Sequence, residues 1–399
     1  MPVDHSRHLF LSLAAVLAGF GALMVHSASV TSWPTEAEQV YLSRHLVFLA
    51  LGIATGGISA VLPAEFWRKA APWLFAATLL LLVAVLVPGV GTEVNGARRW
   101  LRYGPLSLQP CELAKITLPL LLARLLASRF RRLDGTFGCG KSRSLTGGVA
   151  VRNELACEEG SGTAGPPRGA YAPRAPALFL VWPILLIVPL VAVQPDLGSA
   201  LFIAGGGAIG LFAGGWPLRN FVFASLAAVP ACWALLVVRP YQMNRIKGFL
   251  AAWADWNDAP YQLKQSLMTL AAGGTWGVGL GRGWQKLSFL PEANTDFVVA
   301  VVGEELGLVG TLGLAAVWVA LYFSGLRLLG RLGRTSFEWI AGFTLLTQLV
   351  LQAALNVAVV TAMVPPKGIP HPLISYGGSN LVVSLAAIGI VVSLSRGER

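Results

Sequence analysis

Charged residues are scarce in this sequence. Only 12% of its 399 residues are Asp, Glu, Lys or Arg, while 55% are hydrophobic and the mean hydropathy is +0.65. A soluble domain carries about 25% charged residues. The low charge excludes a cytosolic globular enzyme, a disordered protein and a fibrous repeat, and it predicts a polytopic membrane protein.

Cysteine pairing and internal repetition are also lacking. The four cysteines have neither zinc-ligand nor disulfide-framework spacing, so the sequence predicts no metal centre and no redox role. We find no internal repeat, which counts against the inverted repeats of many transporters.

The sequence has an excess of positive charge, with 30 Lys and Arg against 19 Asp and Glu, and these cations lie in short segments between apolar runs. Lipid headgroups and topology account for such cations, so we predict a lipid bilayer as a partner and no nucleic acid.

Long apolar runs are abundant instead. A membrane helix needs about 20 mostly apolar residues. The runs that qualify cover residues 9–27, 44–63, 71–90, 109–127, 176–193, 198–215, 219–238, 296–325, 337–361 and 379–395. We therefore expect an all-α polytopic membrane protein with ten transmembrane helices in a single membrane domain, 1–399. We interpret the first run as a retained helix, because no convincing signal-peptide cleavage site follows it.

The distribution of Lys and Arg predicts the orientation of the helices. More of these residues lie on the side of the N-terminus than on the other side, so we expect both termini in the cytoplasm. Segment 128–175, rich in Gly, Ser, Pro and Arg, is then a cytoplasmic, disordered loop. Segment 239–295 is a long extracytoplasmic loop, and its Trp and Tyr residues favour the bilayer surface.

Ionisable residues at membrane depth are costly, so each one is a candidate functional residue. Glu112 and Lys115 are three residues apart on one predicted helix face. They form either a buried structural ion pair or the polar bottom of a binding site for a sugar or an anionic headgroup. Glu304 and Glu305 lie two turns inside another predicted helix. We expect at least one of these two to be paired or protonated, in a structural role.

Arginines and aspartates mark the predicted outer face. Arg98 and Arg99 precede Trp100, and two adjacent Arg could grip a diphosphate bidentately or snorkel to lipid phosphates. Asp196 follows Gln-Pro, where we expect a tight turn and a helix cap. Asp296 stands near the start of a predicted helix. It is either another cap or a carboxylate at the mouth of a cavity that can accept a hydroxyl proton.

A run rich in Pro and Gly precedes the last predicted helix, at residues 365–379. Irregular backbone next to membrane helices lines a cavity or forms a sharp turn. In the first case Ser375 would face a ligand, and Gly377 and Gly378 would permit its close approach. Taken together, the residues favour an outward-facing polar cavity for a polyprenyl-diphosphate-linked substrate, in transfer or in transport.

These motifs resemble the SEDS family (shape, elongation, division and sporulation), which includes FtsW, RodA and SpoVE. The order matches along essentially the whole chain: NGARRW, QPCELAK, QPDLG, YQLKQS, LPEANTDF, GEELGLVG and HPLISYGGSN. The stretch 261–297 is more similar to FtsW than to RodA. Three residues depart from the usual family pattern, where Ser, His and Ser stand: Cys111, Asn294 and Asn380.

The resemblance implies a peptidoglycan glycosyltransferase of the bacterial cytoplasmic membrane, for cell division or elongation. It implies that the enzyme polymerises lipid II onto undecaprenyl-diphosphate-linked glycan, beside a class B penicillin-binding protein (a transpeptidase) and other division or elongation proteins. The proposed catalytic aspartate of the family matches Asp296. The substrate-binding candidates are Arg98, Arg99, Trp100, Glu112, Lys115, Lys286, Ser375, Gly377 and Gly378.

The leaving diphosphate needs cationic stabilisation, for which Arg98, Arg99, Lys115 and Lys286 are candidates. We expect no obligatory cofactor, although Mg²⁺ or Mn²⁺ could be held mainly by the diphosphate itself. Two other function classes stay open. A lipid II flippase needs a polar passage and no base, and a non-catalytic scaffold needs only to bind a penicillin-binding protein.

Overall fold

The computed structural model describes residues 2–29, 36–94, 96–104, 106–137, 178–238, 240–286 and 289–397. Within these residues helices dominate, as the apolar runs predict. The longer helices are α1 (Pro2–Ser29), α2 (Glu36–Val61), α3 (Ala64–Ala84), α4 (Pro110–Phe137), α5 (Leu178–Val193), α6 (Leu197–Ala213), α7 (Leu218–Val238), α10 (Val298–Leu329), α11 (Phe337–Val360) and α12 (Gly378–Leu394). Each predicted apolar segment coincides with one of them.

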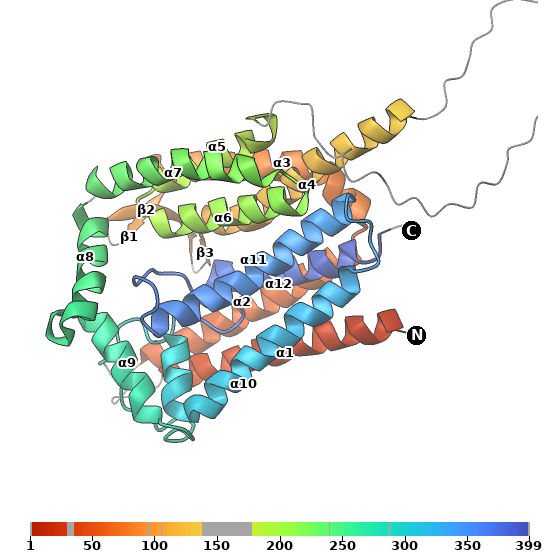
Figure 1. Cartoon of the computed structure of the whole chain (residues 1–399). Helices are drawn as coiled ribbons and strands as arrows, with labels where there is room; N and C mark the ends of the chain where they lie inside the picture. The colour runs from red at the N-terminus through yellow and green to blue at the C-terminus, as the bar shows by residue number, and fades with distance from the viewer. Residues whose placement is uncertain are drawn as a thin grey trace, which may run out of the picture.

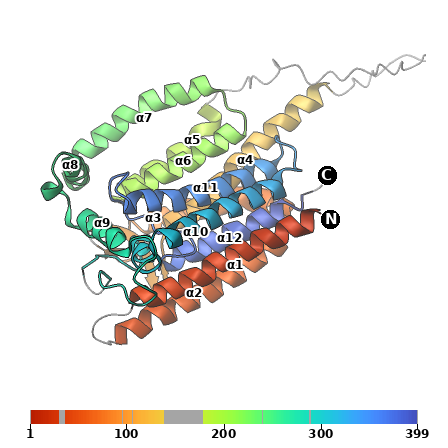
Figure 2. The ribbon, with the colours of Figure 1, turned by 60° about the horizontal axis from the view of Figure 1, so that its bottom comes forward.

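Six described helices are long and apolar enough to cross a membrane, namely α1, α2, α3, α7, α10 and α11. Three more, α5, α6 and α12, are apolar but shorter. Figure 1 shows both termini at one end of the helix bundle, which is the arrangement that an even number of crossings produces. α7 has no buried residue, and Figure 2 shows it at the edge of the molecule, joined to α8 (Pro240–Ala254).

A small sheet at the opposite end corrects the all-α expectation. Strands β1 (Thr92–Val94), β2 (Ala97–Tyr103) and β3 (Leu106–Leu108) form an antiparallel sheet in the order β1-β2-β3. Gly96 and Gly104 lie between successive strands with positive φ, the conformation that tight hairpin turns require. The sheet leads directly into α4 and forms one wall of this end of the bundle (Figure 1).

Two predicted loops also differ from the expectation. α4 continues to Phe137, so the first part of segment 128–175 is helical, and its remainder lies outside the described residues. Segment 239–295 contains α8, a short 3₁₀ helix, η1 (Trp256–Asp258), and α9 (Tyr261–Gly273). Several Trp and Tyr residues of this segment therefore lie on short helices, while its place outside the membrane stays a prediction.

α10 is interrupted inside its apolar sequence. Gly307 has φ 66° and ψ −162°, which breaks the helical hydrogen-bond ladder. The segment after α9 supplies the missing partners: the N–H groups of Val278 and Gly279 donate to the carbonyls of Glu304 and Glu305, at 2.9 and 3.0 Å. Leu308 in turn donates to the carbonyl of Gly274, at 3.0 Å. Irregular backbone is tolerated at this depth where protein groups satisfy the freed backbone groups, as they do here for Glu304, Glu305 and Leu308.

Candidate active site

Asp296 lies in the turn that leads into α10. Its carboxyl group is half-buried, and this burial raises its pKa to about 7, with the charge of Glu292 acting in the same direction. Arg245 and Arg99 oppose the rise. The alternative that Asp296 caps the helix is wrong, because the N-cap is Phe297 and it has no side-chain cap hydrogen bond. The carboxyl group of Asp296 is therefore not engaged in capping α10.

Two neighbouring elements fix the backbone around Asp296. The Asn356 side chain of α11 donates through Nδ2 to the carbonyls of Asp296 and Ile369, each at 2.8 Å. Tyr376 N–H donates to the carbonyl of Asn294, at 2.8 Å. A Cβ added at Gly368 would lie 3.0 Å from Asp296 Oδ2, so this loop passes close to the carboxylate. The turn that carries Asp296 is thus held between α11 and the loop that precedes α12.

Cations surround this turn, from three separate parts of the chain. Arg99 of β2 lies 3.4 Å from Asp196 Oδ2, and its buried Nε finds no acceptor within the described residues. Arg245 of α8 donates to the carbonyl of Pro366, at 3.5 Å. Burial lowers the pKa of the Lys367 ammonium, while the charge of Asp196 opposes this change. The site therefore combines one carboxyl group that titrates near neutrality with several cations.

Asp196 has the predicted capping role. Its Oδ1 accepts the N–H of Ser199 at 3.0 Å, at the start of α6. Its Oδ2 also faces Arg99 and the Gln109 amide, at 3.4 and 3.5 Å. The same carboxylate therefore caps a helix and orients one of the cations near Asp296.

Arg98 and Arg99 do not act as a pair. Successive side chains of a strand point to opposite faces. Arg98 binds Glu93 on the exposed side at 3.1 Å, whereas Arg99 binds Asp196. Trp100 is half-buried and lies opposite Thr92 in the sheet. A bidentate grip by the two arginines is thus wrong for this conformation, and only Arg99 belongs to the Asp296 site.

The Glu112–Lys115 pair forms as predicted. Lys115 Nζ lies 2.7 and 2.8 Å from the two carboxylate oxygens of Glu112, and it also donates to Gln352 Oε1, at 3.0 Å. Gln352 Nε2 donates to the carbonyl of Pro370 and to Asn380 Oδ1. The hollow beside the pair measures about 20 Å³, which is room for one water molecule and not for a sugar ring. In this conformation the pair connects α4, α11 and the loop 361–377.

The predicted ligand contacts of Ser375, Gly377 and Gly378 are replaced by protein contacts. Ser375 Oγ accepts the N–H of His371 at 2.8 Å and is buried. A Cβ at Gly378 would meet the ring of Phe48 at 2.5 Å, so the close approach is to this ring and not to a ligand. Gly377 has extended backbone and no close neighbour, so nothing in the structure explains a requirement for glycine there.

Lys286 is not brought to Asp296. It is buried, and its Nζ lies 2.6 Å from Glu305 Oε1 and 3.0 Å from Ser27 Oγ. Glu304 Oε1 accepts the N–H groups of Trp284 and Gln285. These contacts confirm the pairing expected for Glu304 and Glu305, and they hold the Lys286 ammonium between Glu305 and Ser27.

Sequence reasoning missed Gln352 and Asn356, which bind the loop and the turn at the site and share a buried polar stripe with Gln348. Gln348, Gln352 and Asn356 follow one another at four-residue spacing along α11, and all three are buried. Such a polar stripe in an apolar helix was the available signal, since polar groups at membrane depth are functional candidates. Arg245 and Lys367 gave no comparable signal, because cations near helix ends are ordinary. No group of three His, Cys, Asp or Glu side chains suited to a metal ion is found within the described residues.

Comparisons with known proteins show the family to which the chain belongs. A family model for the FtsW, RodA and SpoVE group, described as "Cell cycle protein", matches residues 7–399. The chain is 33% identical to the probable peptidoglycan glycosyltransferase FtsW of Geobacter sp. strain M18, over 97% of this chain and 96% of that protein. It is 36% identical to the FtsW of Tolumonas auensis, over 98% of this chain and 92% of that protein.

Solved structures show the same architecture. A chain from a peptidoglycan synthase complex, described for its coordination of polymerization and crosslinking, aligns with a TM-score of 0.70 at 28% identity, over 97% of this chain and 96% of that chain. The rod shape determining protein RodA of Thermus thermophilus aligns with a TM-score of 0.63 at 27% identity, over 97% and 95% of the two chains. With the family model spanning nearly the whole sequence, this chain belongs to the FtsW/RodA/SpoVE family of cell cycle proteins.

Proposed function

We propose that this protein is a peptidoglycan glycosyltransferase that polymerises lipid II into β-1,4 glycan strands at the outer face of the bacterial cytoplasmic membrane. The observation that carries the proposal is Asp296, whose pKa is raised to about 7 and which lies near Arg99 and Arg245. A base with a pKa near the working pH is the most effective general base. The names of the FtsW relatives, which cover nearly the whole chain, support the same reaction.

In the proposed reaction, the 4-hydroxyl of a GlcNAc on lipid II attacks the anomeric carbon of a MurNAc that carries undecaprenyl diphosphate. Asp296 accepts the hydroxyl proton as the new C–O bond forms, and the bond from the anomeric carbon to the diphosphate breaks. Attack from the opposite side inverts the anomeric centre and gives the β-1,4 link. A positioned base contributes roughly 10²–10⁴-fold to such a step.

The leaving diphosphate departs with the bonding electron pair, so it requires positive charge. Arg99 is the first candidate, since one buried N–H of its guanidinium is left without an acceptor among the described residues. Arg245, whose charge acts on Asp296, and Lys367, whose side chain lies near Gly198 and Asp196, are further candidates. The described carboxylates offer no dedicated cage for Mg²⁺ or Mn²⁺, so a divalent ion in this reaction would depend mainly on the diphosphate oxygens.

The proposal extends to topology and partners. Ten crossings, with both termini in the cytoplasm, place the end that holds Asp296 outside, where lipid II presents its sugars. The distribution of Lys and Arg along the chain supports this orientation. A class B penicillin-binding protein is the proposed partner, because the similar solved chain comes from a complex described as coordinating polymerization and crosslinking.

An Asp296→Asn variant tests the assignment, with Asp258→Asn as the matched control. Asp258 is exposed in η1, so its substitution makes the same change of side chain at the surface of the preceding segment. Both purified variants are given labelled lipid II, with and without the cognate penicillin-binding protein. We expect Asp296→Asn to form no glycan while it still binds the partner, and Asp258→Asn to polymerise normally. Full polymer from Asp296→Asn would overturn the base assignment, and partner binding without polymer from the wild type would favour a scaffold. Lipid II movement across vesicles without polymer from the wild type would favour a flippase.

A further inference from the structure

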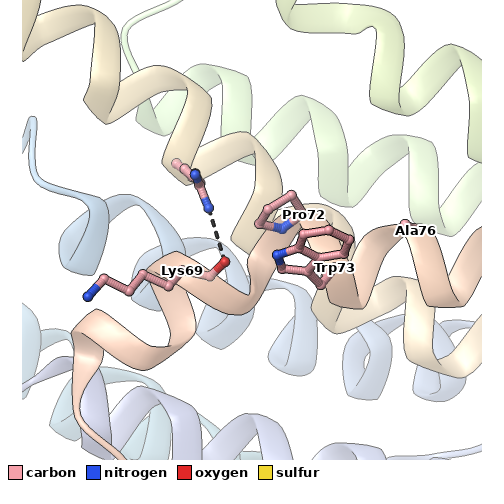
Figure 3. A pocket seen from close by; sticks show the side chains of 5 residues that line it. Lys69, Pro72, Trp73 and Ala76 are labelled. Atoms are coloured by element: carbon pink, nitrogen blue, oxygen red, sulfur yellow. Dashed lines mark hydrogen bonds between the residues drawn. The ribbon is translucent and has the colours of Figure 1, made fainter.

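Two adjoining hollows lie between α3 and α4, at the end of the molecule that holds both termini. One measures about 520 Å³ and is lined by Lys69, Pro72, Trp73, Ala76 and Arg124. The other measures about 370 Å³, and it shares Lys69 and Arg124 with the first. Figure 3 shows Lys69, Pro72, Trp73 and Ala76 along one face of α3, as their spacing of three and four residues requires. Neither hollow belongs to the Asp296 site.

The backbone chemistry of α3 explains why Arg124 is held there. Pro72 has no N–H, so the carbonyl of Arg68, four residues earlier, loses its helical partner. Arg124 Nη1 donates to this carbonyl at 2.9 Å, and to the carbonyl of Lys69 at 3.1 Å. A guanidinium has five N–H donors, so the other donors of Arg124 remain for a ligand in the hollows. The proline therefore fixes a cation between the two helices.

Charge around the hollows is positive. Arg68, Lys69 and Arg124 face a single carboxylate, Glu65, which forms an ion pair with Arg68 and lies 3.6 Å from Lys69. The Lys69 side chain is 77% exposed and its contact with Glu65 is long, so its ammonium can reach an anion in the hollows as well. This charge is complementary to a phosphate group.

The lining of the two hollows changes from polar to apolar, as a phospholipid changes from its headgroup to its acyl chains. The hollow nearer the end of α3 carries Glu65, Arg68 and Ser128, while the deeper one carries Pro72, Trp73 and Ala76. Trp73 is 78% exposed, and Trp favours the level of the lipid headgroups. Lys69 and Arg124 stand at the border between the polar and the apolar part.

We propose that the α3–α4 groove binds an anionic phospholipid, with the phosphate between Lys69 and Arg124 and the acyl chains along Trp73 and Ala76. Basic pockets between membrane helices bind such headgroups. A free phosphate would use only the polar hollow and would leave the exposed Trp73 face unfilled. This lipid site is separate from the proposed active site, and it stands whether or not the chain polymerises glycan.

The test is native mass spectrometry of the purified full chain with phosphatidylglycerol or phosphatidylcholine of identical acyl chains. We expect the wild type to bind phosphatidylglycerol about fivefold more tightly, which is the contribution of one cation near a lipid surface. Lys69→Gln and Trp73→Ala should each weaken phosphatidylglycerol binding, and Lys69→Arg should keep it. Both side chains are largely exposed, so these variants should fold. Arg331→Gln, an exposed cation just after α10 at the same end, is the control.

Three outcomes would overturn the proposal. The first is equal affinity of the wild type for the two lipids. The second is a loss in Arg331→Gln that equals the loss in Lys69→Gln, which would indicate general surface charge. The third is complete displacement of phosphatidylglycerol by inorganic phosphate together with no effect of Trp73→Ala, which would indicate a site for free anions.

Discussion

Asn356 and Asp296 are joined by a hydrogen bond of 2.8 Å from the side-chain amide of the first to the backbone carbonyl of the second. The same amide nitrogen also donates to Ile369, in the loop before α12. One buried side chain of α11 therefore sets the distance between the turn that carries Asp296 and the loop that faces it. Asp296 itself gains no rigidity from a helix cap, so we infer that Asn356 is its main positioning residue.

Replacing Asn356 by Ala should lower both stability and activity. Each buried carbonyl left without a donor costs about 1–3 kcal/mol, so the melting temperature in detergent should fall. A displaced base should also lower the polymerisation rate, by up to about 100-fold, and should shift the pH at which activity is half-maximal. Gln348→Ala, earlier on the same buried stripe, is the control. A lower melting temperature with an unchanged rate and pH profile would leave Asn356 a purely structural residue.

Activity should follow the ionisation of Asp296. The carboxyl group must be deprotonated to accept a proton, so with its pKa at about 7 the rate should fall on the acid side of pH 7. Glu292 raises this pKa through its charge, so Glu292→Gln should move the acid limb of the rate profile to lower pH. The measurement is the polymerisation rate between pH 5 and pH 9. A limb that stays in place in Glu292→Gln would contradict the assignment.

Stability should depend on pH through the same group. The pKa of Asp296 is raised above the ordinary value of 3.8, so the folded state binds more protons than the unfolded state between pH 4 and pH 7. Its stability therefore falls as the pH rises through this window. Asp296→Asn removes the effect, so its melting temperature should match the wild type near pH 4 and exceed it above pH 7. Melting curves in detergent at pH 4, 6 and 8 provide the check.

Variants of the Glu112–Lys115 pair separate its effect on stability from its effect on activity. Lys115→Met leaves Glu112 buried without its partner, which should cost about 3–5 kcal/mol. Glu112→Gln with Lys115→Met should melt close to the wild type, because no charge is then left unpaired. We expect this double variant to remain poorly active, since Gln352 loses the ammonium that orients it towards Pro370 and the loop facing Asp296. A double variant that both melts and polymerises like the wild type would exclude a role of the pair in the site.

Much of the helical framework could be predicted because hydropathy alone determines it. The positions of α1–α7 and α10–α12 follow from apolar runs, and the Glu112–Lys115 pair follows from helical spacing. The short strands β1 and β3 could not be predicted, since three residues carry too little alternation to detect. The separate directions of Arg98 and Arg99 depend on that sheet, so their supposed joint grip failed with it.

The composition of the site depended on contacts distant in sequence. Asp296 was found because it precedes an apolar helix, but its neighbours Arg99 and Arg245 come from β2 and α8. No local sequence pattern predicts that β2 and α8 lie close to the turn that carries Asp296. Lys286, a candidate for binding the diphosphate, contacts Glu305 in the structure, and nothing local in the sequence pairs these two residues.

Lys286 and Glu305 should therefore contribute to stability as a unit. Both side chains are almost completely buried, and their contact of 2.6 Å joins the segment after α9 to α10. Lys286→Met leaves the Glu305 carboxylate with only the hydroxyl of Ser27, so the free energy of unfolding should fall by about 3–5 kcal/mol. Adding Glu305→Gln removes the unpaired charge and should recover most of the loss. The measurement is the melting temperature of the two variants in detergent, with Lys247→Met, an exposed cation of α8, as the control. A Lys286→Met protein that melts like the Lys247→Met control would show that the segment is anchored by its backbone hydrogen bonds to Glu304 and Glu305, and not by this ion pair.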